Sequence, residues 1–205
     1  MPAFWDGVLV TLQVLLLGSL ISFSLGLVWA IAFRAPTRFV RWPVGVVTEF
    51  IRTTPLLVQL FFLFFVLPEW GVQFSTLTTG ILAIGLHYST YTAQVYRAGI
   101  EAVPAGQWEA ATALSLPAHR TWCAVILPQA VRRVVPALGN YVVAMLKDTP
   151  ILAGIGVLEM LQQARLSSAQ SFEFTEPLTV VGVAFVLIAC PASLLLRALE
   201  RRLVH

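Results

Sequence analysis

The sequence predicts an all-α integral membrane protein with five transmembrane helices, and three observations support this prediction. The 205 residues are 58% hydrophobic and only 11% charged, whereas about 25% of residues are charged in soluble domains. Five apolar stretches follow one another along the chain, and basic residues gather in alternate connections between them. A soluble fold of this length has too little interior to bury so much apolar surface. We therefore expect residues 1–205 to form a single transmembrane domain.

Three of the spans are defined by long uncharged runs. Residues 7–33 and 70–96 contain 27 uncharged residues each, and residues 177–196 contain 20. A helix needs about 20 apolar residues to cross the hydrocarbon core of a bilayer. The first run is expected to form span one, the later part of the second run span three, and the third run span five.

The other two spans have to include charged residues. The uncharged runs 53–68 and 134–146 contain 16 and 13 residues, which is short for a crossing. Span two therefore takes in Glu49 and Arg52 at its edge. Span four, extended to residues 134–158, takes in Lys147 and Asp148. Ionisable residues within a span usually face a cavity or a partner.

The basic residues predict the orientation of the chain. Ten of its 13 Lys and Arg residues fall in the connections after spans one, three and five: Arg34, Arg38, Arg41, Arg97, Arg120, Arg132, Arg133, Arg197, Arg201 and Arg202. The positive-inside rule makes these connections cytoplasmic. The N-terminus is then outside and the C-terminus in the cytoplasm.

The cytoplasmic connection over about residues 97–133 is expected to hold two short helices. Pro104 and Gly106 end the helix of span three, and residues 107–114 suit a short helix. Pro117 fits the first turn of a second helix that runs to about Leu127, and Pro128 separates it from span four. Residues alone leave two readings open, a surface that binds a partner or a hairpin that lies on the lipid headgroups.

This connection resembles the EAA loop of ABC importer permeases. Glu109-Ala110-Ala111 matches the start of that motif, and Leu127-Pro128 follows at the offsets of 18 and 19 residues from the Glu. Ser115 stands where the family usually has Gly. Further segments resemble polar amino acid permeases: 52–59, 96–100 and 147–150.

The resemblance implies a type I ABC importer permease fold whose EAA loop couples to a cytoplasmic ATPase. The residues that it assigns to coupling are Trp108, Glu109, Ala110, Ala111, Leu114, Ser115, Leu127 and Pro128. It also implies a dimer of ATPase subunits that bind ATP and Mg, a second permease copy or paralogue, and an extracytoplasmic solute-binding protein. We expect no cofactor, metal or catalytic site in this chain, no nucleic-acid partner, and a location in the bacterial cytoplasmic (inner) membrane.

Spans two and four are expected to line the substrate pathway, because each has a cation followed three residues later by Pro. Pro within a span frees backbone carbonyls that a polar solute could use. The candidate pathway residues are Glu49, Arg52, Thr53, Thr54, Pro55, Gln59, Tyr88, Tyr91, Lys147, Asp148, Thr149 and Pro150. Simple Pro kinks, a Glu49–Arg52 pair and interhelical hydrogen bonds from the tyrosines are the alternative interpretations.

A mixed-charge path suits a zwitterion, such as a polar amino acid or an amino acid-derived compatible solute. Residues 87–114 and 158–164 resemble ectoine/hydroxyectoine permeases most, while glutamate, glutamine and basic amino acids remain open. Two other function classes are a stand-alone channel or secondary transporter and an intramembrane enzyme. The sequence has no phosphate loop, metal-binding pair or nucleophile motif, so we expect any ATP hydrolysis in a separate subunit.

Overall fold

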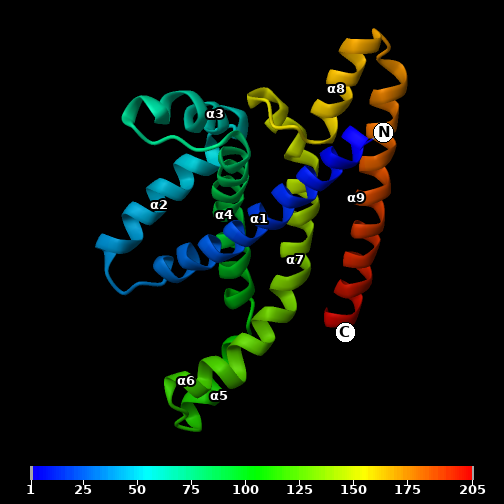
Figure 1. Cartoon of the computed structure of the whole chain (residues 1–205). Helices are drawn as coiled ribbons and strands as arrows, with labels where there is room; N and C mark the ends of the chain where they lie inside the picture. The colour runs from blue at the N-terminus through cyan, green and yellow to red at the C-terminus, as the bar shows by residue number, and fades with distance from the viewer. Residues whose placement is uncertain (1, 205) are drawn as a thin grey trace.

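The structure is a computed structural model that describes residues 2–204, all of whose regular elements are helical (Figure 1). In chain order they are α1 (Pro2–Phe33), α2 (Arg38–Thr53), α3 (Leu56–Phe61), the π-helix η1 (Phe62–Val66), the 3₁₀-helix η2 (Leu67–Trp70), α4 (Thr76–Glu101), α5 (Ala105–Ala113), α6 (Ala118–Arg120), the π-helix η3 (Thr121–Ile126), α7 (Leu127–Asp148), the 3₁₀-helix η4 (Thr149–Ile155), α8 (Met160–Ser171) and α9 (Thr175–Val204).

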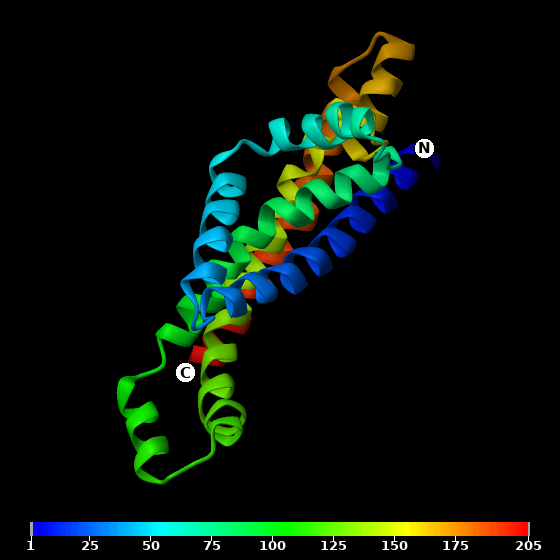
Figure 2. The same ribbon diagram turned by 90° about the vertical axis from the view of Figure 1, so that its left-hand side faces the viewer.

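The long helices form an elongated bundle with different elements at its two ends. Helix α1 crosses α4 and α7, and α9 packs against α7 and α8. Figure 2 shows α5 and α6 extending from the end of the bundle at which α9 terminates. The start of α1 lies at the opposite end, together with α8.

Two helices within residues 2–204, α1 and α9, are both long and apolar enough to cross a membrane. Two more crossings are obtained if each bent pair of helices counts as one: α2 with Leu56–Trp70, and Ala118–Ile155 with α8. Helix α4 matches the expected span three and has 26 residues. It buries many polar side chains, among them Thr79, Ser89, Thr90 and Thr92, so its composition alone does not identify it as a span.

The second expected span differs from the single helix that the sequence predicts. Helix α2 ends at Thr53, and the following segment Leu56–Trp70 is bent by 103° relative to it. Thr54 is extended, with φ −86° and ψ 132°. Pro55 explains the break, because proline lacks the backbone N–H and disfavours helical geometry in the residue before it. The apolar run 53–68 therefore begins at a corner of the chain.

Close helix crossings hold the bundle together. An added Cβ at Gly26 of α1 would lie 2.1 Å from Thr92 Oγ1 of α4. The Thr92 hydroxyl donates instead to the Ser22 carbonyl of α1 at 2.8 Å. Small residues allow membrane helices to approach closely enough for such interhelical hydrogen bonds. Two other crossings are equally close. An added Cβ at Gly99 of α4 would lie 2.2 Å from the Val134 side chain of α7. One at Gly139 of α7 would lie 2.1 Å from the Leu196 side chain of α9.

We predict that Gly26→Leu destabilises the protein, because the side chain has to displace α4. Overpacking of this kind costs about 1–3 kcal/mol. Thermal unfolding in detergent should show a lowered midpoint. Gly182 of α9 provides the matched control, since no atom of the described residues lies within 4 Å of an added Cβ there. Equal effects of Gly26→Leu and Gly182→Leu would contradict this account of the α1–α4 crossing.

Candidate functional site

The first candidate site is the α5 hairpin, residues 102–126, which connects α4 to α7. Pro104 precedes the first residue of α5 in an extended conformation, so the chain breaks where the sequence predicts. Glu109, Ala110 and Ala113 are exposed along one side of α5, and Leu114 is 72% exposed at its end. This side of the hairpin offers a carboxylate, small residues and one apolar side chain to a partner.

The opposite side of α5 is used within the hairpin itself. Trp108 packs edge-to-face on Trp122 with ring centroids 5.2 Å apart, and Ala111 is only 3% exposed. Both lie on one helical face because they are three residues apart. Of the residues expected to contact a partner, these two instead hold α5 against the segment that leads into α7.

Ser115 ends α5 in the left-handed region, with φ 51°. The backbone N–H of Leu116 donates to the Ala111 carbonyl at 3.0 Å and that of Ser115 to the Thr112 carbonyl at 2.9 Å. These two bonds form a Schellman motif, which usually has Gly at the left-handed position. The serine therefore makes the same turn as Gly would, at a steric cost.

Pro128 does not separate two helices, as the sequence suggested, because the chain stays helical from Ala118 to Asp148. The π-helix η3 immediately precedes Leu127 and Pro128, both of which are exposed. Proline cannot donate to the carbonyl four residues earlier and clashes with it in a regular α-helix. The wider turn of a π-helix relieves that clash without ending the helix.

Side-chain contacts fasten the α5 hairpin to three helices. Arg34, which follows α1, lies over the Trp122 ring at 5.1 Å. The Gln129 amide of α7 donates to the Gln107 side chain of α5 at 3.1 Å, and Arg133 of α7 donates to the carbonyl of Ala102 at the end of α4. The hairpin is therefore bonded to the ends of α1 and α4 and to the start of α7.

The second candidate site is a tyrosine cluster formed by Tyr88 and Tyr91 of α4 and Tyr141 of α7. Their ring centroids are 5.9 to 6.0 Å apart. The Tyr88 hydroxyl donates to Asp148 Oδ2 of α7 at 2.6 Å. Such a charge-assisted bond is short and strong, so it connects the two helices directly at the edge of the aromatic cluster.

The corner between α2 and α3 is bonded to this cluster. The Gln59 amide nitrogen lies 2.6 Å from the Ile51 carbonyl, which Pro55 leaves without its helical donor, and 2.9 Å from the Thr54 carbonyl. It also lies 3.0 Å from Nδ1 of His87. The Tyr91 hydroxyl donates to the Arg52 carbonyl at 3.2 Å. The carbonyls freed by the break are thus occupied by protein side chains.

Most of the remaining pathway candidates interact with groups of their own helix or the adjoining one. Arg52 pairs with Glu49 one helical turn away, as in the alternative interpretation above. The hydroxyls of Thr53 and Thr54 donate to carbonyls of α2, and that of Thr149 donates to the Leu146 carbonyl at 2.8 Å. Pro150 lies in the first turn of η4, where the chain continues as a helix without the sharp corner seen at Pro55.

Lys147 and Asp148 are adjacent in the chain but face different helices. Asp148 is bonded to Tyr88 of α4, whereas Lys147 lines a small cavity with Phe185, Ala189 and Ser193 of α9. Successive residues of an α-helix are rotated by about 100° about its axis. Only Asp148 of this pair reaches the tyrosine cluster.

Tyr141 is the member of the cluster that the sequence analysis missed. It lies seven residues before Asp148, a spacing that puts both residues on the same face of α7. That spacing was available from the sequence, but the partner tyrosines on α4 are about 50 residues earlier in the chain. Nothing local joins the two segments.

We predict that Ser115→Gly stabilises the α5 hairpin, because Gly adopts the left-handed conformation without the steric cost. A gain of about 1 kcal/mol would slow hydrogen exchange of the α5 amides by about 5-fold. Thr112→Gly places the same residue inside α5 and should accelerate that exchange. Faster exchange in Ser115→Gly would contradict the conformational argument.

Comparisons with known proteins agree with the membrane architecture. Residues 22–205 match the family described as binding-protein-dependent transport system inner membrane component. The chain is 46% identical over 200 residues to a probable amino-acid ABC transporter permease protein, y4tG, of Sinorhizobium fredii, covering 98% of this chain and 87% of that protein. It is 30% identical over 200 residues to a putative glutamine transport system permease protein of Rickettsia conorii, covering 97% and 92% of the two chains.

A solved structure described as a crystal structure of an amino acid ABC transporter with histidines has the same fold. Its TM-score is 0.93 at 33% identity, over 98% of this chain and 94% of that chain. The family match and these relatives extend over nearly the whole chain, including both candidate sites. The chain belongs to the family of binding-protein-dependent transport system inner membrane components and is a permease subunit of an amino acid ABC transporter.

Proposed function

We propose that this permease subunit imports a polar amino acid or a related zwitterion by passing the motion of a cytoplasmic ATPase through the α5 hairpin to the tyrosine cluster. One observation carries the proposal: the hairpin connects α4 directly to α7, and these are the two helices that hold the cluster. A movement of α5 therefore acts on both walls of the proposed pathway.

The exposed side of α5 is the proposed docking surface for the ATPase. It comprises Glu109, Ala110, Ala113, Leu114 and Ser115, with the exposed Leu127 and Pro128 at the start of α7. The inward Trp108 and Ala111 support this surface from behind. Small residues permit close backbone approach, while a packed inner side makes the hairpin stiff enough to transmit a displacement.

The proposed topology has five crossings, formed by α1, the α2–α3 pair, α4, α7 and α9, with the N-terminus outside. The start of α1 and the α5 hairpin lie at opposite ends of the bundle (Figure 1), which supports this orientation. The partners are an ATPase dimer that binds ATP and Mg, a second permease copy or paralogue, and an extracytoplasmic solute-binding protein. The setting is the bacterial cytoplasmic membrane, as the family implies.

The proposed pathway is lined by the tyrosine cluster with Asp148 and Arg52. Asp148 can accept from the ammonium group of a zwitterion, and Arg52 can donate to its carboxylate if it leaves Glu49. The substrate class is kept at polar amino acids, because the relatives above are named for amino acids or glutamine. The narrower ectoine interpretation finds no support among them.

Purification of the tagged chain from native membranes in mild detergent tests the assembly. Mass spectrometry should find a cytoplasmic ATPase in roughly equal amount, with or without a second permease. A well-folded chain that purifies alone would instead indicate a stand-alone channel or secondary transporter.

We predict that Glu109→Lys abolishes transport while leaving the chain inserted in the membrane. The charge reversal lies at the centre of the proposed docking surface, and a lost charge-assisted contact costs about 1.5–3 kcal/mol. Solute uptake and solute-stimulated ATP hydrolysis are measured in the reconstituted complex. Hydrolysis should no longer respond to solute.

Glu200→Lys is the matched control for this variant, because Glu200 is an exposed glutamate on α9, outside the hairpin. It makes the same change of charge and should leave both activities near their original values. Normal solute-stimulated hydrolysis in Glu109→Lys would exclude the coupling role.

We predict that Asp148→Asn lowers solute uptake about 10- to 100-fold, because it removes the carboxylate from the tyrosine cluster. Lys147→Gln changes the adjacent residue, which faces α9, and should lower uptake by less than about 3-fold. Uptake is measured in proteoliposomes at equal amounts of folded complex. The reverse order of the two effects would place the pathway on the other face of α7.

A further inference from the structure

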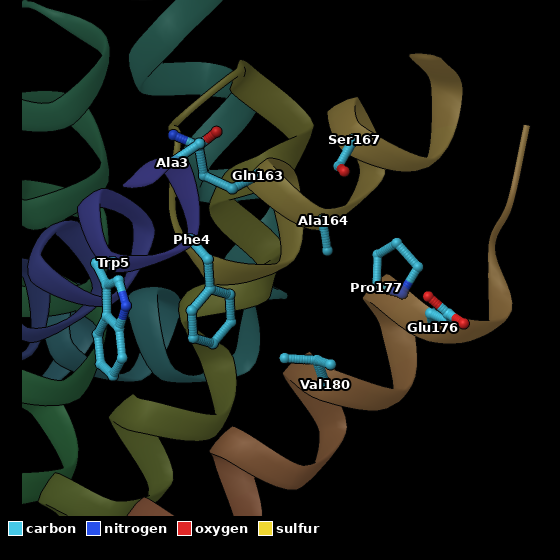
Figure 3. Close-up of a pocket in the computed structure, with 9 residues that line it drawn as sticks. All are labelled: Ala3, Phe4, Trp5, Gln163, Ala164, Ser167, Glu176, Pro177 and Val180. Carbon is cyan, nitrogen blue, oxygen red and sulfur yellow. The ribbon is translucent and has the colours of Figure 1, made fainter. Parts of the chain in front are cut away.

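A cavity of about 450 Å³ opens between the start of α1, α8 and the start of α9. Figure 3 shows Phe4 on one side of it, Ser167 and Ala164 above, and Pro177 and Glu176 on the other side. Its polar side chains include Gln163, Ser167 and Glu176, and among the residues that the structure describes none in the lining is basic. This cavity, the mouth of the groove, therefore carries a few polar side chains, one of them a carboxylate, among apolar neighbours.

A second cavity of about 530 Å³ continues from the first along α1 and α9. The two share Phe4, Trp5 and Val180 in their walls. Among the described residues that line the second cavity, Thr179 is the only one with a hydroxyl, carboxyl, amide or basic side chain. Its hydroxyl donates to the Thr175 carbonyl of its own helix at 2.6 Å. The described lining of this part of the groove is therefore almost entirely apolar.

The dimensions of the second cavity match one leaflet of a bilayer. Its lining extends from Phe4 to Leu12 on α1 and from Thr179 to Ile188 on α9. At 1.5 Å per residue these segments are about 12 Å and about 14 Å long. One leaflet contributes about 15 Å of hydrocarbon. The polar mouth lies toward the end of the bundle, at the level of α8, where headgroups are found if α1 and α9 cross the membrane.

We propose that this α1–α9 groove is a binding site for one phospholipid with an amine-bearing headgroup, such as phosphatidylethanolamine. One acyl chain fills the apolar part, and the ammonium group of the headgroup interacts with Glu176 beside the amide of Gln163 and the hydroxyl of Ser167. The Glu176 carboxylate at the mouth disfavours an anionic headgroup. The groove lies in the leaflet opposite to the α5 hairpin, so this site is separate from both the docking surface and the tyrosine cluster.

Trp5 provides the readout, because it borders both cavities and is 63% exposed. The full chain, with its co-purified subunits, is reconstituted in phosphatidylcholine bilayers that contain increasing amounts of a lipid with brominated chains. Trp5-dependent quenching is the difference between the unchanged chain and Trp5→Phe. Brominated phosphatidylethanolamine should reach half-maximal quenching at about 2- to 5-fold lower mole fraction than brominated phosphatidylcholine.

Two further variants distinguish recognition of the lipid headgroup from binding of the acyl chain. Glu176→Gln should abolish the preference between the two lipids, while Val180→Phe should reduce quenching by both because it fills the junction of the cavities. Leu195→Phe enlarges an exposed side chain of α9 outside the groove and should change neither.

Equal quenching by the two lipids in the unchanged chain would mean ordinary surrounding lipid only and would overturn the proposal, whether or not the variants fold. A preference that survives Glu176→Gln would overturn the assignment of the headgroup to this residue.

Discussion

The approach of the long helices to one another depends on a glycine at each of their main crossings. Gly26, Gly99 and Gly139 stand where α1 meets α4, α4 meets α7 and α7 meets α9, and a methyl group at any of them would overlap the facing helix. In a bilayer the hydrophobic effect contributes little to the association of helices. Close packing and interhelical hydrogen bonds therefore have to hold the helices together. The hydrogen bond from Tyr88 to Asp148 belongs to the same α4–α7 pair that Gly99 holds close. The close packing of α4 on α7 therefore also brings the Tyr88 hydroxyl within hydrogen-bonding distance of Asp148.

The backbone carbonyls at the Pro55 corner also determine how α2, α3 and α4 are arranged around the tyrosine cluster. Breaking a helix in the membrane leaves carbonyls that have to find donors inside the protein. Here Gln59 and Tyr91 supply those donors, which ties the end of α2 to α3 and α4. A solute that uses the same carbonyls has to displace these side chains. On the proposed pathway, the binding of a polar solute at this corner would be coupled to the angle between α2 and α3.

Much of this architecture could be predicted from the sequence, because the length of an uncharged apolar run and the position of a proline are both properties of a short stretch of chain. The first and last spans appear as α1 and α9, and Pro104 ends α4 as expected. The 103° corner at Pro55 was not predicted, since a proline signals a break without its angle. The division of Lys147 from Asp148 and the inward direction of Trp108 also depend on which neighbours pack against each face. Tyr141 joined the cluster only through contacts between distant segments, which no local pattern encodes.

The π-helix before α7 accommodates one extra residue while keeping the rotational register between the α5 hairpin and the tyrosine cluster. A π-helical turn holds one more residue than an α-helical turn. Loss of a single residue from Thr121–Ile126 would let this segment become a regular α-helix with almost the same total rotation. Loss of a residue from the regular part of α7 before Tyr141 would instead rotate the rest of α7 by about 100° relative to the hairpin. Tyr141 and Asp148 would then turn away from α4 although neither had been changed. The number of residues between Leu127 and Tyr141 is therefore as strict a requirement as the identity of any side chain in the cluster. Insertions or deletions there should be far less tolerated than in the loop before α2 or, for a single deletion, in the π-helix.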